Sequence, residues 1–191
     1  MTVKRLFIDT ETTGTDETKN AVFQIAGVVE IDGHPKEEFE ILLRPHEGAV
    51  LERLVMIKHR ERGITEADIA NYPTSAEAMK ELIAVLETYV DRFNREDKFF
   101  FIGYNAFFDE KFIRAFFERQ KDPYYGSWFF VPVLDVAILA SQFLIKERAT
   151  MENFKLHTVA RHLGIELDTS KLHDALYDAH LARLVYRKVT R

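Results

Sequence analysis

The pattern of apolar and polar positions predicts strands near the start of the chain. The apolar run 6–8 is closed by Gly14 within six residues, and this short length favours a buried strand over a helix. The β-branched stretch 21–31 ends at the hairpin signal Asp32-Gly33, and residues 37–44 alternate between apolar and polar side chains. The first three strands are therefore expected to form an antiparallel meander.

The remainder of the chain predicts helices around one further strand. Residues 98–103 are a second unbroken apolar run closed by glycine, which indicates another buried strand. Apolar residues at helical spacing predict helices over 50–59, 75–93, 107–119, 134–144, 154–163 and 171–189. Residues 123–132 are expected to form an aromatic loop, and the polar segment 146–155 a mobile one. This order predicts an α/β fold, in which a mixed sheet is flanked by helices, and a single domain over 1–191.

Composition narrows the class of protein. With 47% hydrophobic and 30% charged residues, the chain has the composition of a soluble globular protein. No apolar run is long enough to cross a bilayer, so we expect no membrane association. The absence of cysteine excludes disulfides and fits a cytoplasmic protein. A net charge of −5 argues against a broad basic face for duplex DNA, but not against binding of a short strand end.

Two acidic residues stand where the first strand ends. Asp9 and Glu11 follow the apolar run directly, and side chains alternate along a strand, so both should project to the same side. Carboxylates held this close repel each other unless a cation lies between them, and hard oxygen ligands suit Mg²⁺ or Mn²⁺. Taken alone, this pair could equally be two solvated residues of a strand-to-loop turn.

Four further polar residues, on two later helices or next to them, stand where they could join this pair or support it. Asp109 lies one turn into the helix after the second buried strand, at the strand edge where such sheets bind ligands. Asn105 precedes this helix as its expected cap. In the last helix, His173 is placed at the start and Asp178 falls near the apolar stripe, where an unpaired carboxylate is costly. Without more context, Asp109 could serve only the helix dipole, and His173 could be a surface residue.

These residues form motifs that resemble a known family. D-x-E-T-T-G at 9–14, N-x-x-F-D at 105–109 and H-x-x-x-x-D at 173–178 occur in the order found in the DEDD exonucleases. The H-x-x-x-x-D form is similar to the histidine subclass, the group of the epsilon proofreading subunit of bacterial DNA polymerase III. The resemblance extends over nearly the whole chain, and includes R-G-I-T at 62–65, which resembles H-G-I-T in the family.

The resemblance implies a ribonuclease H-like fold and a 3′→5′ exonuclease that uses two divalent ions, Mg²⁺ or Mn²⁺. It implies metal ligation by Asp9, Glu11, Asp109 and Asp178, with His173 as the general base. It also implies substrate binding by the residues Thr12, Thr13, Gly14, Asn105 and Phe108, although a core role for Phe108 is equally compatible with the sequence. Tyr104, Gln24 and Arg62 depart from the family pattern, and we expect them to affect substrate preference more than activity.

The substrate implied by the resemblance is a single-stranded 3′ end, with DNA favoured because T-T-G after Glu11 is similar to the polymerase-associated branch. An RNA-trimming enzyme, similar to ribonuclease T or oligoribonuclease, is an alternative, as are a non-catalytic nucleic-acid-binding module and a small-nucleotide phosphohydrolase. Any polymerase or repair partner is expected to be a separate chain. Late basic residues are expected to form a solvated face, or in the segment 146–155 to guide the strand.

Overall fold

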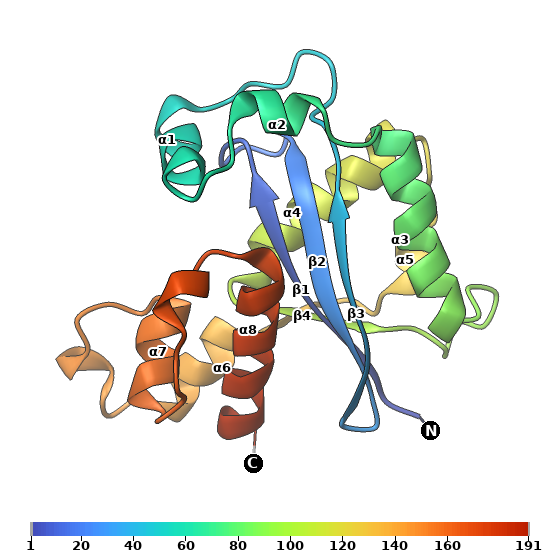
Figure 1. Ribbon diagram of the computed structural model, residues 1–191. Coiled ribbons are helices and arrows are strands. Elements are labelled where there is room, and N and C mark those ends of the chain that lie inside the picture. The colour runs from blue at the N-terminus through green and yellow to red at the C-terminus, as the bar shows by residue number, and fades with distance from the viewer. Residues whose placement is uncertain (1, 191) are drawn as a thin grey trace.

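A computed structural model describes residues 2–190 and contains a five-stranded sheet in the order β3-β2-β1-β4-β5 (Figure 1). β1 pairs antiparallel with β2 and parallel with β4, β2 pairs antiparallel with β3, and β4 pairs parallel with β5. The predicted mixed sheet, a meander extended by parallel strands, is confirmed. The strands are β1 (Lys4–Thr12), β2 (Val22–Ile31), β3 (His34–Leu42), β4 (Phe100–Gly103) and β5 (Leu134–Asp135).

The helices follow the predicted order with shifted ends. They are α1 (Arg53–Glu61), α2 (Glu66–Ala70), α3 (Ser75–Tyr89), α4 (Ala106–Arg119), α5 (Tyr125–Trp128), α6 (Val136–Phe143), α7 (Leu156–His162) and α8 (Ala175–Val189), with 3₁₀ turns η1 (Arg148–Thr150) and η2 (Thr169–Lys171). Three predictions were wrong in detail. The aromatic loop contains α5, the predicted helix 134–144 begins as β5, and the last helix starts four residues later than expected.

Each face of the sheet is covered by its own group of helices (Figure 1). On one face, Leu6 and Ile8 of β1 pack with buried residues of α3, α4 and α5. On the other face, Phe7 packs with buried residues of α6, α7 and α8. Successive residues of β1 therefore serve opposite layers, as the alternation of a strand requires. α1 and α2 lie beyond the carboxyl end of β1, at the top of Figure 1.

The end of α3 and the start of α4 differ from prediction. α3 stops at Tyr89 because Val90 is extended, so Phe93 is not on its buried face and is 84% exposed. Asn105 occupies the cap position of α4 as predicted, but it adopts a left-handed conformation with φ 64° and its side chain makes no capping hydrogen bond.

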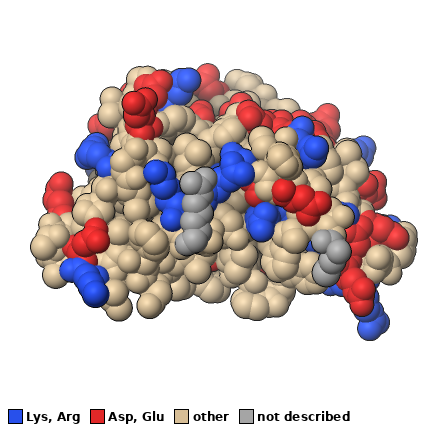
Figure 2. All heavy atoms as spheres, turned by 90° about the horizontal axis from the view of Figure 1, so that it is seen from below, with Lys and Arg blue, Asp and Glu red and all other residues tan. Residues whose placement is uncertain are grey.

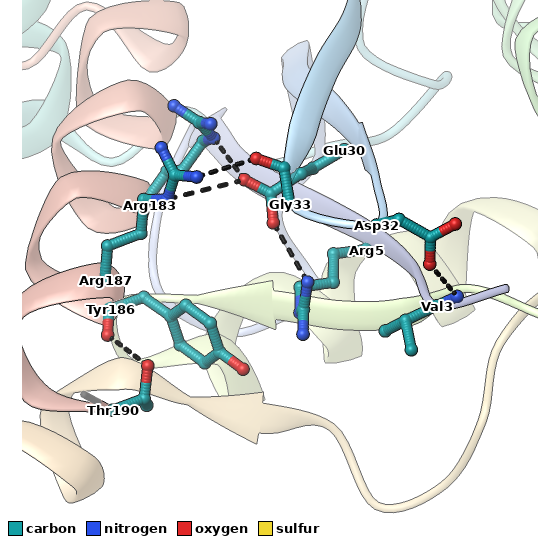
Figure 3. A network of polar contacts seen from close by, with 9 residues as sticks. All are labelled: Val3, Arg5, Glu30, Asp32, Gly33, Arg183, Tyr186, Arg187 and Thr190. Carbon is teal, nitrogen blue, oxygen red and sulfur yellow. Dashed lines mark hydrogen bonds and ion pairs between the residues drawn. The ribbon is translucent and has the colours of Figure 1, made fainter.

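A buried acid fixes α8 against the sheet. Glu30 of β2 is 1% exposed and accepts hydrogen bonds from Arg183 Nε of α8 at 2.7 Å and from Arg5 Nη1 of β1 at 3.1 Å (Figure 3). Arg187 donates to the carbonyl oxygen of Gly33 at 2.7 Å. The expectation that the late basic residues form a solvated face is wrong for Arg183, which is only 7% exposed.

Charged side chains are unevenly distributed over the end of the molecule at which the termini lie. Figure 2 views the end at which the termini lie, and shows Lys and Arg side chains near the middle of that face, with Asp and Glu mostly toward its margins. This end lies opposite the carboxyl end of β1. Within residues 2–190, none of the helices has the length and apolar character needed to span a bilayer.

Candidate active site

The site is built around the carboxyl end of β1, where polar residues replace apolar ones. Asp9 and Glu11 are partly buried and alternate with the buried Thr10 and Thr12. They continue the side of the strand on which Phe7 meets α8, so the predicted common orientation of the two carboxylates agrees with the structure.

Asp109 approaches the carboxyl end of β1 from α4, which lies on the opposite face of the sheet from α8. Its side chain is 3% exposed, and its Oδ1 accepts hydrogen bonds from Thr10 N at 3.0 Å and from Thr10 Oγ1 at 2.7 Å. A carboxylate needed only for the helix dipole would be solvated. Instead, Asp109 is buried and its Oδ1 is fixed by two hydrogen bonds from Thr10 of β1. Its Oδ2 is therefore left for another partner.

The start of α8 supplies the remaining two predicted residues. Asp178 lies in the first turn of the helix, and Asp174 caps it by accepting a hydrogen bond from Tyr177 N at 2.9 Å. His173 was expected at the helix start, but it precedes the cap in a left-handed conformation with φ 67°. This backbone places an exposed imidazole beside the acids rather than on the helix.

The four carboxylates share one electrostatic environment. Burial, and then repulsion from Asp109, Asp178 and Glu11, raises the pKa of Asp9 well above its ordinary value. Burial raises the pKa of Glu11 to about 7, of Asp109 to about 7 and of Asp178 to about 6. Desolvation, followed by the positive charge of Arg62, lowers the pKa of His173, so its imidazole is neutral and able to accept a proton near pH 7.

Glu11 has two basic neighbours from α1 and its end. Arg62 Nη1 donates to Glu11 Oε1 at 2.7 Å. His59 Nε2 lies 3.1 Å from the carbonyl oxygen of Thr12, which fixes the proton on that nitrogen. Its buried Nδ1 lies 3.8 Å from Glu11 Oε2 and has no hydrogen-bond partner in the described part of the chain. His59 also packs edge-on against Phe23, with ring centroids 4.8 Å apart.

Two clefts flank the carboxylates. A cleft of about 510 Å³ lies over Glu11 and is lined among others by Thr12, Lys58, Phe108 and His173. A second cleft of about 290 Å³ lies over Asp9 and Asp178. The two clefts share a wall made of Lys155, Leu172 and His173.

The predicted substrate-binding residues divide into two groups. Thr12 and the half-buried Phe108 line the larger cleft, and Phe108 also packs against Phe112 of the core at 4.9 Å between ring centroids. Thr13 and Gly14 are buried, and Thr13 Oγ1 donates to the carbonyl oxygen of Val50 at 2.8 Å. Asn105 is exposed, and neither cleft includes it.

Gly14 is required by close packing in this turn. A Cβ at this position would lie 2.3 Å from the side chain of Asn20, which itself accepts a hydrogen bond from Asp16 N. Thr12 Oγ1 donates to the carbonyl oxygen of Gly14 at 2.6 Å. Gly14 therefore shapes the loop that follows the two acids, and through it the position of the Thr12 side chain.

The sequence does not predict three polar residues that the structure places at the site, namely Arg62, Thr10 and His59. Arg62 was noted only as a departure from a family pattern, whereas it is ion-paired with Glu11. Thr10 and His59 were not predicted as site residues. The position of Thr10 between two acids on a strand was a usable signal, because it must face the opposite layer. Nothing local marked His59, which is 48 residues from Glu11 along the chain.

The donor set fits divalent cations with oxygen ligands. Burial raises the pKa of all four carboxylates from β1, α4 and α8, and repulsion within the cluster adds to this for Asp9, Glu11 and Asp109. A hard cation would relieve that repulsion. Within residues 2–190 no three acidic or histidine side chains already have the spacing of a metal site. Two of the relevant oxygens are engaged by protein donors, Glu11 Oε1 by Arg62 and Asp109 Oδ1 by Thr10.

Comparisons with known proteins identify exonucleases and polymerases that are similar to this chain. DNA polymerase III PolC-type of Oceanobacillus iheyensis is 28% identical over 188 residues, which are 96% of this chain and 11% of that protein. Ribonuclease T of Pectobacterium atrosepticum is 27% identical over 191 residues, 94% of this chain and 78% of that protein. The structure of E. coli Exonuclease I in complex with a dT13 oligonucleotide matches with a TM-score of 0.76 at 20% identity, over 99% of this chain and 41% of that one.

These matches confirm the predicted ribonuclease H-like fold and the resemblance to the DEDD exonucleases. The chain spans about a tenth of the PolC-type relative and about two fifths of Exonuclease I. A family model described as Exonuclease (RNase T) matches residues 6–186, nearly the whole chain. On that match, the chain is a member of this exonuclease family.

Proposed function

We propose that this protein is a metal-dependent 3′→5′ exonuclease that releases nucleoside monophosphates from single-stranded DNA ends. One observation carries the proposal. At the carboxyl end of β1, between two clefts, His173 lies together with four carboxylates, those of Asp9, Glu11, Asp109 and Asp178. Loss of any one of these groups would favour a non-catalytic binding module, but all five are present.

The carboxylates would hold two divalent cations, Mg²⁺ or Mn²⁺. When bound, two such cations stabilise the negative charge on the attacking and leaving oxygens of a phosphodiester. Asp9 would be a ligand together with the other three acids, which lie close enough to contribute to its raised pKa after burial. Thr10 contributes by holding Asp109 Oδ1, so that the orientation of the Asp109 carboxylate is fixed before a cation arrives.

His173 would accept the proton of the attacking water. Its imidazole lines both clefts and has a lowered pKa, so the base would be neutral near pH 7. The larger cleft would receive the terminal nucleoside, with Phe108 against the sugar or base and Thr12 beside it. Two adjoining clefts suit a strand that passes the carboxylates better than they suit a small free nucleotide.

An RNA substrate is the second candidate, and one observation favours it. The segment similar to ribonuclease T covers most of that protein, 78%, whereas the PolC-type match covers 11% of a polymerase. An enzyme that distinguishes RNA from DNA does so by contacting the 2′-hydroxyl. Thr10 and Thr12 are the hydroxyl residues among the described residues that line the larger cleft, and the Thr10 hydroxyl is already bonded to Asp109, so Thr12 is the candidate contact. A separate polymerase or repair partner stays a prediction.

The test is a gel of matched 5′-labelled single-stranded DNA and RNA oligomers, incubated with Mg²⁺, Mn²⁺ or chelator. We expect ladders that shorten from the 3′ end only with metal, and faster shortening of DNA. Asp9→Asn should lower the rate more than about a hundred-fold. Glu61→Gln, an exposed acid of the larger cleft outside the carboxylate cluster, is the matched control and should retain activity. No shortening of either oligomer by wild type would refute the proposal, and faster RNA shortening would select the second candidate.

A further inference from the structure

Within residues 2–190, Arg62 is the only arginine or lysine that is ion-paired with the carboxylate cluster. Its Nη1 lies 2.7 Å from Glu11 Oε1, and the two side chains are only 23% and 14% exposed. Across residues 2–190, no other lysine or arginine forms an ion pair with Asp9, Glu11, Asp109 or Asp178. The guanidinium thus supplies positive charge at the point where a cation would bind Glu11.

The backbone of Arg62 is anchored, and its side chain borders two clefts. Arg62 caps the end of α1, and Gly63, with φ 84°, turns the chain away. α1 is tied to the end of β1 through His59, which contacts the carbonyl oxygen of Thr12 and packs against Phe23. A change at Arg62 can therefore be confined to its side-chain torsions.

A cation and Arg62 compete for the same oxygen. Glu11 Oε1 is directed to the guanidinium, so a cation ligated by Oε1, alone or together with Oε2, must replace the hydrogen bond from Nη1. Like charges at such close range in a partly buried site also repel strongly. The other basic neighbour, His59 Nδ1, lies 3.8 Å from Glu11 Oε2 and does not block that oxygen with a hydrogen bond.

Space and charge around Arg62 indicate what it does once displaced. Arg62 lines the cleft of about 510 Å³ and also an adjoining cleft of about 540 Å³. The first of these contains Lys58 and Lys155 as well. Three positive side chains in one cleft are favourable when an anion lies among them, and a guanidinium binds phosphate through two parallel hydrogen bonds.

We propose that Arg62 stands in for the divalent cation at Glu11 in the metal-free protein and, once a cation takes that carboxylate, binds a phosphate of the nucleic-acid strand. This inference rests on the proposed exonuclease function and adds to it an order of events. Cation binding and strand binding become cooperative, because the first frees the side chain that serves the second.

The first measurement is the Mn²⁺ affinity of the protein without nucleic acid, by titration calorimetry or by electron paramagnetic resonance of free Mn²⁺. Arg62→Gln removes the competitor and should bind Mn²⁺ at least about fivefold more tightly than wild type. Lys58→Gln removes one positive charge from the same cleft but no contact with Glu11, so its Mn²⁺ affinity should stay within about twofold of wild type. Unchanged or weaker Mn²⁺ binding by Arg62→Gln would overturn the proposal.

The second measurement is strand affinity by fluorescence anisotropy of a labelled single-stranded DNA, in chelator and in Ca²⁺. Arg62→Gln should weaken binding about five- to tenfold in Ca²⁺ and leave it unchanged in chelator, where Arg62 is held by Glu11. Lys58→Gln should weaken binding by a similar factor in both conditions. Equal losses for Arg62→Gln in both conditions would also contradict the proposal.

A folding check and a second variant keep the test decisive. Circular dichroism should show wild-type helix content for Arg62→Gln, since Arg62 lies at the end of α1. If this variant does not fold, Arg62→Lys replaces it, and a weaker hold on Glu11 should give about twofold tighter Mn²⁺ binding. An inactive wild-type enzyme would refute the exonuclease function, whereas the Mn²⁺ titration tests the role of Arg62 independently of turnover.

Discussion

Replacing Asp109 by asparagine should change how the stability of the metal-free protein depends on pH. Burial raises the pKa of Asp109 from 3.8 to about 7, and asparagine keeps an oxygen that can accept both hydrogen bonds from Thr10. Because the folded-state pKa is raised, the stability that protonated Asp109 contributes is fully present below about pH 4. It is lost as the pH rises through about 7.

The size of this loss of stability follows from the pH interval in which Asp109 is ionised in the unfolded chain but still protonated in the folded protein. Between pH 5 and pH 7, the free energy of unfolding should fall by about 1.4 kcal/mol per pH unit, or ~2.7 kcal/mol in all. Because Glu11 shares the repulsion and the surroundings can relax, we count about half, ~1.3 kcal/mol. For a chain of this size, that loss corresponds to ~3–5 °C in Tm.

Differential scanning fluorimetry in chelator at pH 5 and pH 7, for wild type and Asp109→Asn, provides the measurement. The Tm of the variant minus that of wild type should increase by ~3–5 °C between the two pH values. Taking this difference cancels titrating groups elsewhere in the chain. A difference that stays constant or decreases with pH would show that Asp109 is not held with a raised pKa, and would refute the reasoning.

Two other variants test neighbouring parts of the site. His173→Asn keeps a residue that tolerates the left-handed backbone, and should lower kcat/KM about 10²–10⁴-fold without changing Mn²⁺ affinity. Because the pKa of His173 lies below the ordinary histidine value of 6.5, acidification should reduce wild-type activity only once the pH is below that value. A pH–rate profile in which acidification already reduces activity above pH 6.5 would contradict the role of His173 as the base. Tyr104→Phe removes the hydrogen bond from Tyr104 to the carbonyl oxygen of Phe154, and should cost ~1 kcal/mol and speed proteolysis within residues 146–155. Thermal melts and limited digestion check this, and an unchanged digestion pattern would mean that the hydrogen bond does not restrain the segment.

Much of the fold and the acidic part of the site could be predicted because both follow from local patterns. The alternation of β1 predicts the common side of Asp9 and Glu11, and the length of each apolar run separates strands from helices. Asp109 is predicted from its position one turn into the helix after the second buried strand, and Asp178 from the cost of a carboxylate near an apolar stripe. The family resemblance then selects both residues as members of the site. These are properties of short stretches, which a sequence displays directly.

The features that could not be predicted depend on contacts between distant segments. Arg62 meets Glu11 across 51 positions, and Arg183 meets Glu30 across 153, so no local period marks either pair. The start of α8 was misplaced because His173 adopts a left-handed conformation that helical spacing does not reveal. A basic residue in an amphipathic helix is usually solvated, and only the buried acid on β2 makes Arg183 an exception.

The alternation within β1 makes the site unusually sensitive to changes in chain length. Asp9 and Glu11 face α8 while Thr10 faces Asp109 of α4, so a single inserted or deleted residue between Phe7 and Asp9 would exchange the two sets. The sheet could still pair, yet the acids would face the wrong helices. Insertions at the Asp32-Gly33 hairpin, at the other end of the sheet, leave this parity intact. Length variation among functional relatives should therefore be concentrated in that turn and absent from the end of β1.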